Sequence, residues 1–140
     1  MANVTPQKKV NPHQTHFLHA DQIALIASML DHFDGLAIAT DGNGRIVYAN
    51  RSALQLCGFN RSEIKGNSLE KLFDLTAKQQ TSIKQCFDRK TSTSFETMAK
   101  TKSGAAFAVH LKVAPLNPAA EDCGFSVFAV DVSGLKRTIE

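Results

Sequence analysis

The most informative stretch of this sequence is Ile38-Ala39-Thr40-Asp41-Gly42-Asn43-Gly44-Arg45-Ile46-Val47-Tyr48-Ala49-Asn50. Two short apolar runs flank Asp41-Gly42-Asn43-Gly44, and glycine supplies the positive φ angles that a tight hairpin turn requires. A parallel crossover would need about a dozen residues or more between its strands. The two runs are therefore predicted to pair antiparallel, which disfavours the doubly wound nucleotide-binding folds.

Asn50 ends this hairpin and begins a series of short helices. Its side-chain oxygen is placed to cap the next helix, and Gly58 is placed to close that helix in the left-handed conformation. The longest helix follows Thr76 and carries Ile83 and Phe87 at i and i+4 on its inner side. Capping boxes are predicted for the pairs Asn60 with Glu63, Asn67 with Glu70, and Thr76 with Gln79.

The last third of the chain has the alternation of β-strands, over residues 94–100, 107–113 and 125–131. Phe107, Val109 and Leu111 fall on one face of the second of these strands, with His110 opposite. The run 125–131 is apolar on both faces, which predicts that both faces are covered. The fold class predicted is α+β, a five-stranded antiparallel sheet with short helices inserted between its second and third strands.

The chain before the hairpin divides into two parts. Residues 1–19 are polar, carry two prolines, and are predicted to form a flexible arm. Residues 20–34 have the spacing of an amphipathic helix, which we expect to cover the second face of the sheet. Leu25 and Met29 form a second apolar strip on this helix, which favours self-association. The dimer interface is predicted to consist of Ile23, Leu25, Ile26, Met29, Leu30 and Phe33.

Composition excludes several functional classes. The chain has 140 residues, 43% of them hydrophobic, and a net charge of +3, so a nucleic-acid partner is not expected because no basic cluster is present. Three cysteines without a CxxC spacing indicate reduced thiols. No apolar run approaches the roughly 20 residues that span a bilayer, and no secretory signal is recognisable. We therefore expect a cytoplasmic protein without membrane contact.

The order of these elements, together with particular residues, resembles a PAS domain. The resemblance covers about Asp31 to Arg137 and includes the hairpin, Cys57-Gly58-Phe59, Glu63, Gly66, and a closing Asp131-Val132-Ser133. It implies a sensory or dimerisation module of a larger signalling protein, with no catalytic residues. On this basis residues 35–132 form the PAS core, and residues 133–140 begin an outgoing signalling helix. Asn50 matches the family's helix-capping asparagine. Asp131 is expected to cap the outgoing helix or to pair with a basic group, and either contact would fix the angle at which the helix leaves and so relay a signal.

The resemblance assigns no cofactor. The flavin photoreceptor branch carries a cysteine on its inserted helices, whereas residues 63–70 contain none. Haem-binding members place a histidine on the long inserted helix, but no histidine occurs between His32 and His110. Tryptophan, often found near the flavin of redox members, is also missing from this sequence. The cofactor therefore stays unknown.

Two functions are compatible with these patterns. The first is a sensor that binds a small ligand and relays the change to a C-terminal effector, such as a histidine kinase or a diguanylate cyclase. The second is a ligand-free homodimerisation or protein-docking module, because an apolar cavity and an apolar core have the same composition. The ligand pocket is predicted to be lined by Ile83, Phe87, Met98, Phe107, Val109 and Leu111.

Enzymatic and metal sites are disfavoured. His110 with Cys57 or Cys123 would form a catalytic dyad only if a third group oriented the histidine, and the sequence supplies no such group. His13, His16 and His19 recur every third residue, but they fall in the predicted arm. We therefore predict neither a catalytic nor a metal site.

Overall fold

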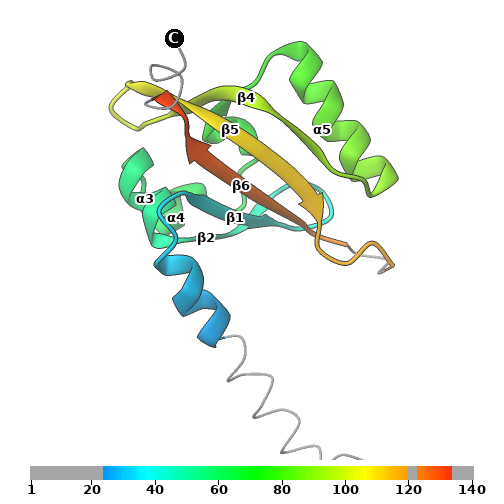
Figure 1. Ribbon diagram of the computed structural model, residues 1–140, viewed down its shortest axis with the longest axis horizontal. Coiled ribbons are helices and arrows are strands. Elements are labelled where there is room, and N and C mark those ends of the chain that lie inside the picture. Colours follow the sequence, from blue (N-terminus) through cyan, green and yellow to red (C-terminus); the bar gives the residue numbers. More distant parts are fainter. Residues whose placement is uncertain (1–23, 120–122, 134–140) are drawn as a thin grey trace, which may run out of the picture.

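The computed structural model describes residues 24–119 and 123–133 (Figure 1). Residues 24–31 are helical. The strands are β1 (Leu36–Thr40), β2 (Ile46–Ala49), β3 (Phe73–Asp74), β4 (Thr93–Lys100), β5 (Ala106–Pro115) and β6 (Phe125–Asp131). The helices between them are α3 (Arg51–Cys57), α4 (Arg61–Ile64), the 3-10 helix η1 (Leu69–Lys71) and α5 (Ala77–Arg89). The predicted arm over residues 1–19, and residues 134–140 of the predicted outgoing helix, lie outside the described residues.

The strands form one antiparallel sheet in the order β2-β1-β6-β5-β4-β3. Every recorded strand pair is antiparallel, so the predicted fold class is confirmed. The last strand in sequence, β6, lies between β1 and β5, so it joins the β1–β2 hairpin to the other three strands. The sheet has six strands where five were predicted, because β3 adds a two-residue edge strand paired with Ala99 and Met98 of β4.

The β1–β2 turn is organised by one carboxylate. Asp41 Oδ1 accepts hydrogen bonds from the backbone N–H groups of Asn43, at 2.9 Å, and Arg45, at 3.0 Å. Gly44 adopts a φ of 84°, in the left-handed region that favours glycine. The side chain of Asp41 and the conformation of Gly44 therefore hold the two strands in the predicted hairpin.

The inserted helices cover the inner face of the sheet. Side chains from α3, α4, η1 and α5 belong to the same buried cluster as the inward residues of β1, β5 and β6. Burial of such a contiguous apolar cluster is the main favourable term in folding. The largest fully buried side chains of this core include Phe73, Phe125, Leu36, Ile46, Ile64, Leu72 and Leu111.

Local capping explains where most of the helices begin. Asn50 caps α3, and the capping boxes of Asn60 with Glu63 and of Thr76 with Gln79 are both formed, as predicted. The prediction for Asn67 with Glu70 is wrong, because η1 begins after Ser68 without a side-chain cap. The Asn67 amide is used elsewhere: its Nδ2 donates to the Glu63 carbonyl at 2.8 Å, at the end of α4.

The N-terminal helix does not cover the outer face of the sheet, so that expectation is wrong for the described residues. Figure 1 shows residues 24–31 extending away from the sheet. On the outer face of β6, Phe128 and Val130 remain 38% and 48% exposed. Phe33, just after the helix, makes an edge-to-face contact with Phe128 on this face, with ring centroids 5.8 Å apart. The Asn50 side chain donates to the carbonyls of Leu30, in the last helical turn, and of Gly35, just after it, and so ties the end of the helix to the core.

Replacing Asn50 with alanine should destabilise the fold more than the loss of an ordinary helix cap. Asn50 is fully buried and makes four side-chain hydrogen bonds, so Asn50→Ala also leaves buried backbone groups without partners. We expect a loss of about 3 to 5 kcal/mol in the free energy of unfolding. Urea denaturation measures it. Asn60→Ala, an exposed N-cap, is the matched control and should cost about 1 kcal/mol; equal losses would contradict the role given to Asn50.

Adding a methyl group at Gly44 should be more costly than adding one at Gly66. Both glycines have similar positive φ angles, so the backbone strain of an alanine is similar at the two positions. A Cβ at Gly44 would lie 2.5 Å from the Phe87 ring, whereas a Cβ at Gly66 would meet no atom within 4 Å. Gly44→Ala should therefore lose about 1 to 3 kcal/mol more than Gly66→Ala in urea denaturation. If the urea denaturation curves of Gly44→Ala and Gly66→Ala have the same midpoint and slope, the turn does not pack tightly against Phe87.

Candidate functional site

A cleft of about 210 Å³ opens between the β1–β2 turn, η1 and α5. Its apolar side chains come from Leu69, Leu75, Ile83 and Phe87. Polar groups stand around them, so the cleft combines an apolar interior with a polar rim, as ligand sites commonly do. The remaining lining residues are Asn43, Gly44, Ser68, Glu70, Gln80 and Lys84.

Helix α5 provides one wall of the cleft, and several contacts hold this helix against the sheet. The Gln79 side chain donates from Nε2 to the carbonyl of Glu96 on β4 at 2.9 Å. Phe87 packs on Phe125, the first residue of β6, with ring centroids 4.5 Å apart. Gly44, in the β1–β2 turn, lies so close to Phe87 that a Cβ on Gly44 would clash with the Phe87 ring. Phe87 therefore lies between the turn and the start of β6.

Two of the six predicted pocket residues line this cleft, Ile83 and Phe87. Val109 and Leu111 are fully buried in the core cluster, and Phe107 is half-buried against it, so the inner face of β5 serves as packing. Met98 lies on the opposite face of β4 and is 39% exposed, which contradicts its assignment to the pocket. Residues alternate between the two faces of a strand, and Thr97 and Ala99 occupy the inward positions of β4.

The other cleft residues were missed for two reasons. The pocket was predicted only from apolar residues of the long helix and the strands, which omits the turn, η1 and Leu75. It also omits Gln80 and Lys84, the polar residues that α5 adds to the rim. A useful signal was present in Gly44, since a glycine that must take a positive φ often permits close backbone approach. Leu69 begins η1 and Leu75 directly follows β3, and both elements are too short for a recognisable pattern in the sequence.

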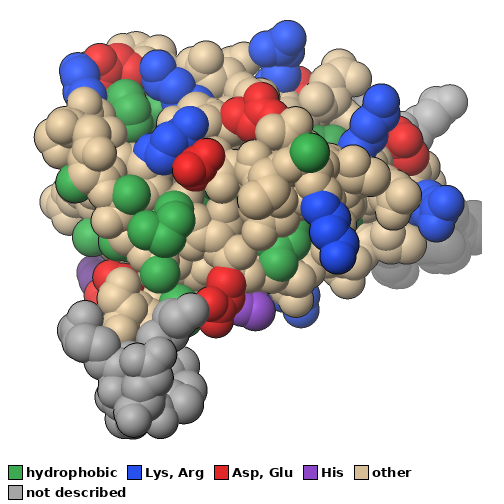
Figure 2. Space-filling view, turned by 90° about the horizontal axis from the view of Figure 1, so that it is seen from above, with side chains coloured by type: hydrophobic (Ala, Val, Ile, Leu, Met, Phe, Trp, Pro, Cys, Tyr) green, Lys and Arg blue, Asp and Glu red, His purple; other side chains and the backbone are tan. Residues whose placement is uncertain are grey.

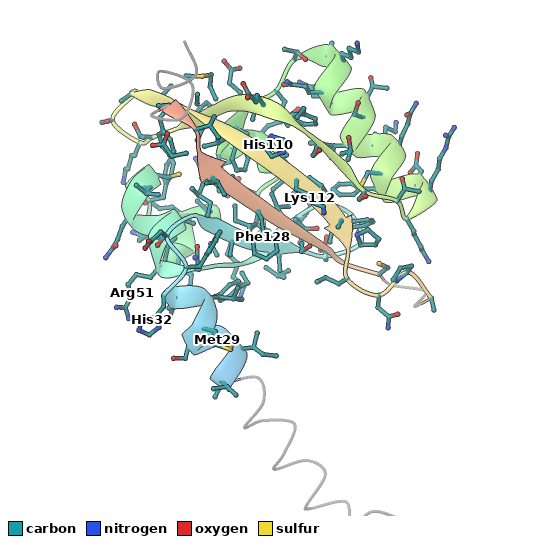
Figure 3. The ribbon with its side chains drawn as sticks, in the orientation of Figure 1. Met29, His32, Arg51, His110, Lys112 and Phe128 are labelled. Carbon is teal, nitrogen blue, oxygen red and sulfur yellow. The ribbon has the colours of Figure 1, made fainter. Side chains whose placement is uncertain are left out.

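The cysteines and His110 do not form a reactive group. His110 is exposed on the outer face of β5, where Figure 3 shows it with Lys112 and, on the neighbouring strand, Phe128. Cys57 and Cys123 are buried in the core cluster. Burial raises the pKa of the Cys57 thiol to about 11, and burial together with the nearby Cys123 raises the pKa of Cys86. Because the thiolate is the nucleophile, these raised pKa values disfavour covalent chemistry.

A polar joint connects the N-terminal helix to the core. We define this joint as the contacts of residues 30–35 with Tyr48, Asn50, Arg51 and Ser52. Asn50 Nδ2 donates to the carbonyls of Leu30 at 2.7 Å and Gly35 at 3.1 Å, while its Oδ1 accepts from the backbone N–H groups of Ala37 and Ala53. One buried amide side chain therefore ties together the helix, β1 and α3.

Two further groups complete the joint. Asp31 Oδ1 accepts from the Arg51 backbone N–H at 3.0 Å and from the Tyr48 hydroxyl at 3.5 Å. Burial and the Asp31 carboxylate raise the pKa of Tyr48. The Ser52 hydroxyl donates to the Phe33 carbonyl at 2.7 Å. Figure 3 shows Arg51 and His32 at the end of the helix beside this joint.

The predicted dimer residues on this helix differ in exposure. Leu25, Ile26 and Met29 are 62%, 55% and 64% exposed, whereas Leu30 and Phe33 are half-buried. Ile23 lies outside the described residues. A second, almost wholly apolar hollow of about 200 Å³ is lined by Ile26, Ala27, Leu30 and Tyr48. The helix thus presents both projecting apolar side chains and an apolar hollow.

The exit from the sheet is fixed at Asp131. Its Oδ1 accepts a hydrogen bond from the Ser133 backbone N–H at 2.9 Å, a local contact that aspartate often makes with the backbone two residues on. The role of Asp131 as the cap of the outgoing helix stays a prediction, because residues 134–140 lie outside the described residues. Val132 is buried, and its N–H donates to the Ala108 carbonyl at 3.0 Å. The end of β6 is therefore held by contacts of both Asp131 and Val132.

Two further kinds of site, a charged patch and a metal centre, have no support in the face that Figure 2 shows or in the described residues. Figure 2 shows Lys and Arg side chains spread over one face with Asp and Glu among them, not gathered into a patch. Nowhere in residues 24–119 and 123–133 do three or more His, Cys, Asp or Glu side chains gather in a way that would hold a metal ion; His13, His16 and His19 lie outside these ranges. No helix in the described part of the chain has the length and apolar content that crossing a bilayer requires.

Comparison with solved structures identifies similar folds. The PAS domain of an HTR-like protein from Haloarcula marismortui superposes with a TM-score of 0.69 at 17% identity, covering 86% of this chain and 99% of that one. A PAS domain from a two-component sensor histidine kinase gives 0.68 at 17% identity, covering 81% and 98%. The LOV domain of a blue-light activated histidine kinase from Erythrobacter litoralis gives 0.64 at 19% identity, covering 71% and 97%.

Sequence comparison gives the family directly. A search of curated protein sequences finds no match. A family model described as the PAS domain matches residues 34–134, which include the hairpin, the inserted helices, the cleft and the exit at Asp131. This chain therefore belongs to the PAS domain family, whose members are sensory signalling modules that are generally not catalytic.

Proposed function

We propose that this PAS domain is a cytoplasmic, non-catalytic input module that binds a small ligand in the cleft beside α5 and relays the change to a C-terminal effector. The observation that carries the proposal is the contact of Phe87, which lines the cleft, with Phe125 at the start of β6. The same strand ends at Asp131, where the chain leaves the sheet. Ligand binding and signal exit are thus joined by one central strand.

The relay requires two packings of this strand that differ in their affinity for ligand. A ligand shifts such an equilibrium only by the difference between its two affinities, which is commonly about 1 to 3 kcal/mol. Asp131 would carry the shift onward because it holds the Ser133 N–H. The similar PAS domains that come from histidine kinases support an effector of that kind; a diguanylate cyclase is an alternative effector.

We also propose that the domain forms a homodimer through its N-terminal helix. Large apolar side chains scattered singly on a surface are ordinary, whereas a contiguous group of them favours an interface. Leu25, Ile26 and Met29 form such a group beside the apolar hollow at Tyr48. The same group supports the second candidate function, a ligand-free dimerisation or docking module.

A co-purifying molecule distinguishes the two candidate functions. For a sensor, native mass spectrometry and the absorption spectrum of freshly purified protein should reveal a small molecule bound to the folded chain. Removal of that molecule should change amide hydrogen exchange at Val132 and Ser133, because the exit of β6 is coupled to the cleft. A colourless dimer without bound molecules, and with unchanged exchange after denaturation and refolding, would favour docking.

The double substitution Leu25→Glu with Met29→Glu should give a folded monomer. Two carboxylates in an apolar interface are costly to bury without partners, while both side chains are exposed in the single chain and should leave its fold intact. Light scattering measures the mass, and circular dichroism the fold. Leu56→Glu with Leu116→Glu alters two exposed leucines away from the helix and serves as the control. A variant that keeps the dimer mass would defeat this interface.

A further inference from the structure

The rim of the cleft carries one negative and one positive side chain. Glu70 comes from η1 and Lys84 from α5, so the two charges stand on different walls of the same cleft. Both side chains are exposed, and within the described part of the chain neither has an ion-pair partner. An arrangement of this kind presents a carboxylate and an ammonium group to whatever enters between them.

The interior of the cleft is apolar and small. Leu69 and Ile83 are buried, and Leu75 and Phe87 are half-buried, around a volume of about 210 Å³. Sites for drug-sized ligands measure roughly 300 to 1,000 Å³, so the cleft fits a smaller molecule. A matching ligand therefore has a short apolar body together with one cationic and one anionic group.

We propose that the cleft binds a free α-amino acid with an apolar side chain of about the size of leucine. In this arrangement the ligand carboxylate faces Lys84, the ligand ammonium group faces Glu70, and the apolar side chain contacts Ile83 and Phe87. The inference rests on the proposed sensory role of the same cleft. It adds the chemical class of the signal, which the fold alone does not specify.

The charges on the rim discriminate against simpler ligands. A fatty acid has a partner for Lys84 and none for Glu70, and an alkylamine has a partner for Glu70 and none for Lys84. Charge-assisted hydrogen bonds are stronger than neutral ones, so each analogue gives up one of the two stronger contacts. Only a ligand that carries both groups satisfies both walls of the cleft.

Contact with Phe87 would connect the amino acid to the relay. The Phe87 ring lies against Gly44 on one side and against Phe125 on another. A side chain that enters the cleft would therefore press on a ring that is already confined by the turn and by β6. The body of the ligand supplies the mechanical contact, and its two charges supply selectivity.

Three related compounds test the proposal by titration, with amide NMR of the whole 140-residue chain as the readout. L-leucine carries both charges, isocaproate lacks the ammonium group, and isoamylamine lacks the carboxylate, while the apolar body is nearly the same in all three. L-leucine should bind about tenfold or more tightly than either analogue, the ratio expected for one charge-assisted hydrogen bond. Its shifts should map to Leu75, Ile83 and Phe87.

Two substitutions assign the charges. Glu70→Gln should weaken L-leucine about tenfold without weakening isocaproate, and Lys84→Met should weaken L-leucine without weakening isoamylamine. Asp88→Asn and Lys78→Met change the same charges at exposed positions of α5 that do not line the cleft, and both should leave binding unchanged.

The outcomes separate this inference from the proposed function. If an analogue binds as tightly as L-leucine, or if Glu70→Gln and Lys84→Met have no effect, the cleft is a ligand site without amino-acid selectivity and the inference is wrong. If none of the three compounds shifts the cleft residues, the inference is also wrong. In both cases the sensory role is still judged by the co-purifying molecule and by exchange at Val132 and Ser133.

Discussion

The fold depends on the hydrogen bonds of one buried side chain, Asn50. Its amide group satisfies two donors and two acceptors of the backbone, drawn from the N-terminal helix, the entry to β1 and the start of α3. Buried polar backbone groups are costly when they are left without partners. A side chain with both a carbonyl and an NH₂ group at one point is therefore required, and only asparagine or glutamine offers both. The shorter asparagine also serves as a helix cap.

In the proposed mechanism, the central strand β6 connects the ligand cleft to the point where the chain leaves the sheet. Its first residue, Phe125, contacts the cleft through Phe87, and its last residue, Asp131, holds the chain that leaves the sheet. Each neighbour of β6 is paired with it along most of its length, β1 on one side and β5 on the other. Such a strand moves only together with its neighbours, because the ladder hydrogen bonds would otherwise be broken. In the proposed relay, a displacement at Phe125 would therefore be transmitted along the sheet and not absorbed locally.

Most features set by local chemistry were predictable from the sequence, with the cap expected at Asn67 as the exception, and most features set by packing were not. The β1–β2 hairpin and the caps at Asn50, Asn60 and Thr76 depend on residues within a few positions of one another, and all four were predicted. The face of Met98 was mistaken because Met98 is a larger apolar side chain than its inward-facing neighbours Thr97 and Ala99, and size does not decide which face of a strand is buried. The cleft joins the β1–β2 turn to η1 and α5, which follow much later in the chain, so its lining residues other than Ile83 and Phe87 could be identified only from the structure.

The two candidate functions are coupled through β1 and need not compete. Asn50 bonds to the backbone of Gly35 and Ala37, at the start of β1, and also to Leu30 in the N-terminal helix. In the sheet, Ala37 pairs with Phe128 of β6, the residue whose ring contacts Phe33. A change in the direction of the N-terminal helix would therefore act on the same strand that contacts the cleft residue Phe87. Because coupling between two sites is reciprocal, a dimer formed through the helix would alter ligand affinity by the same factor by which the ligand alters dimerisation.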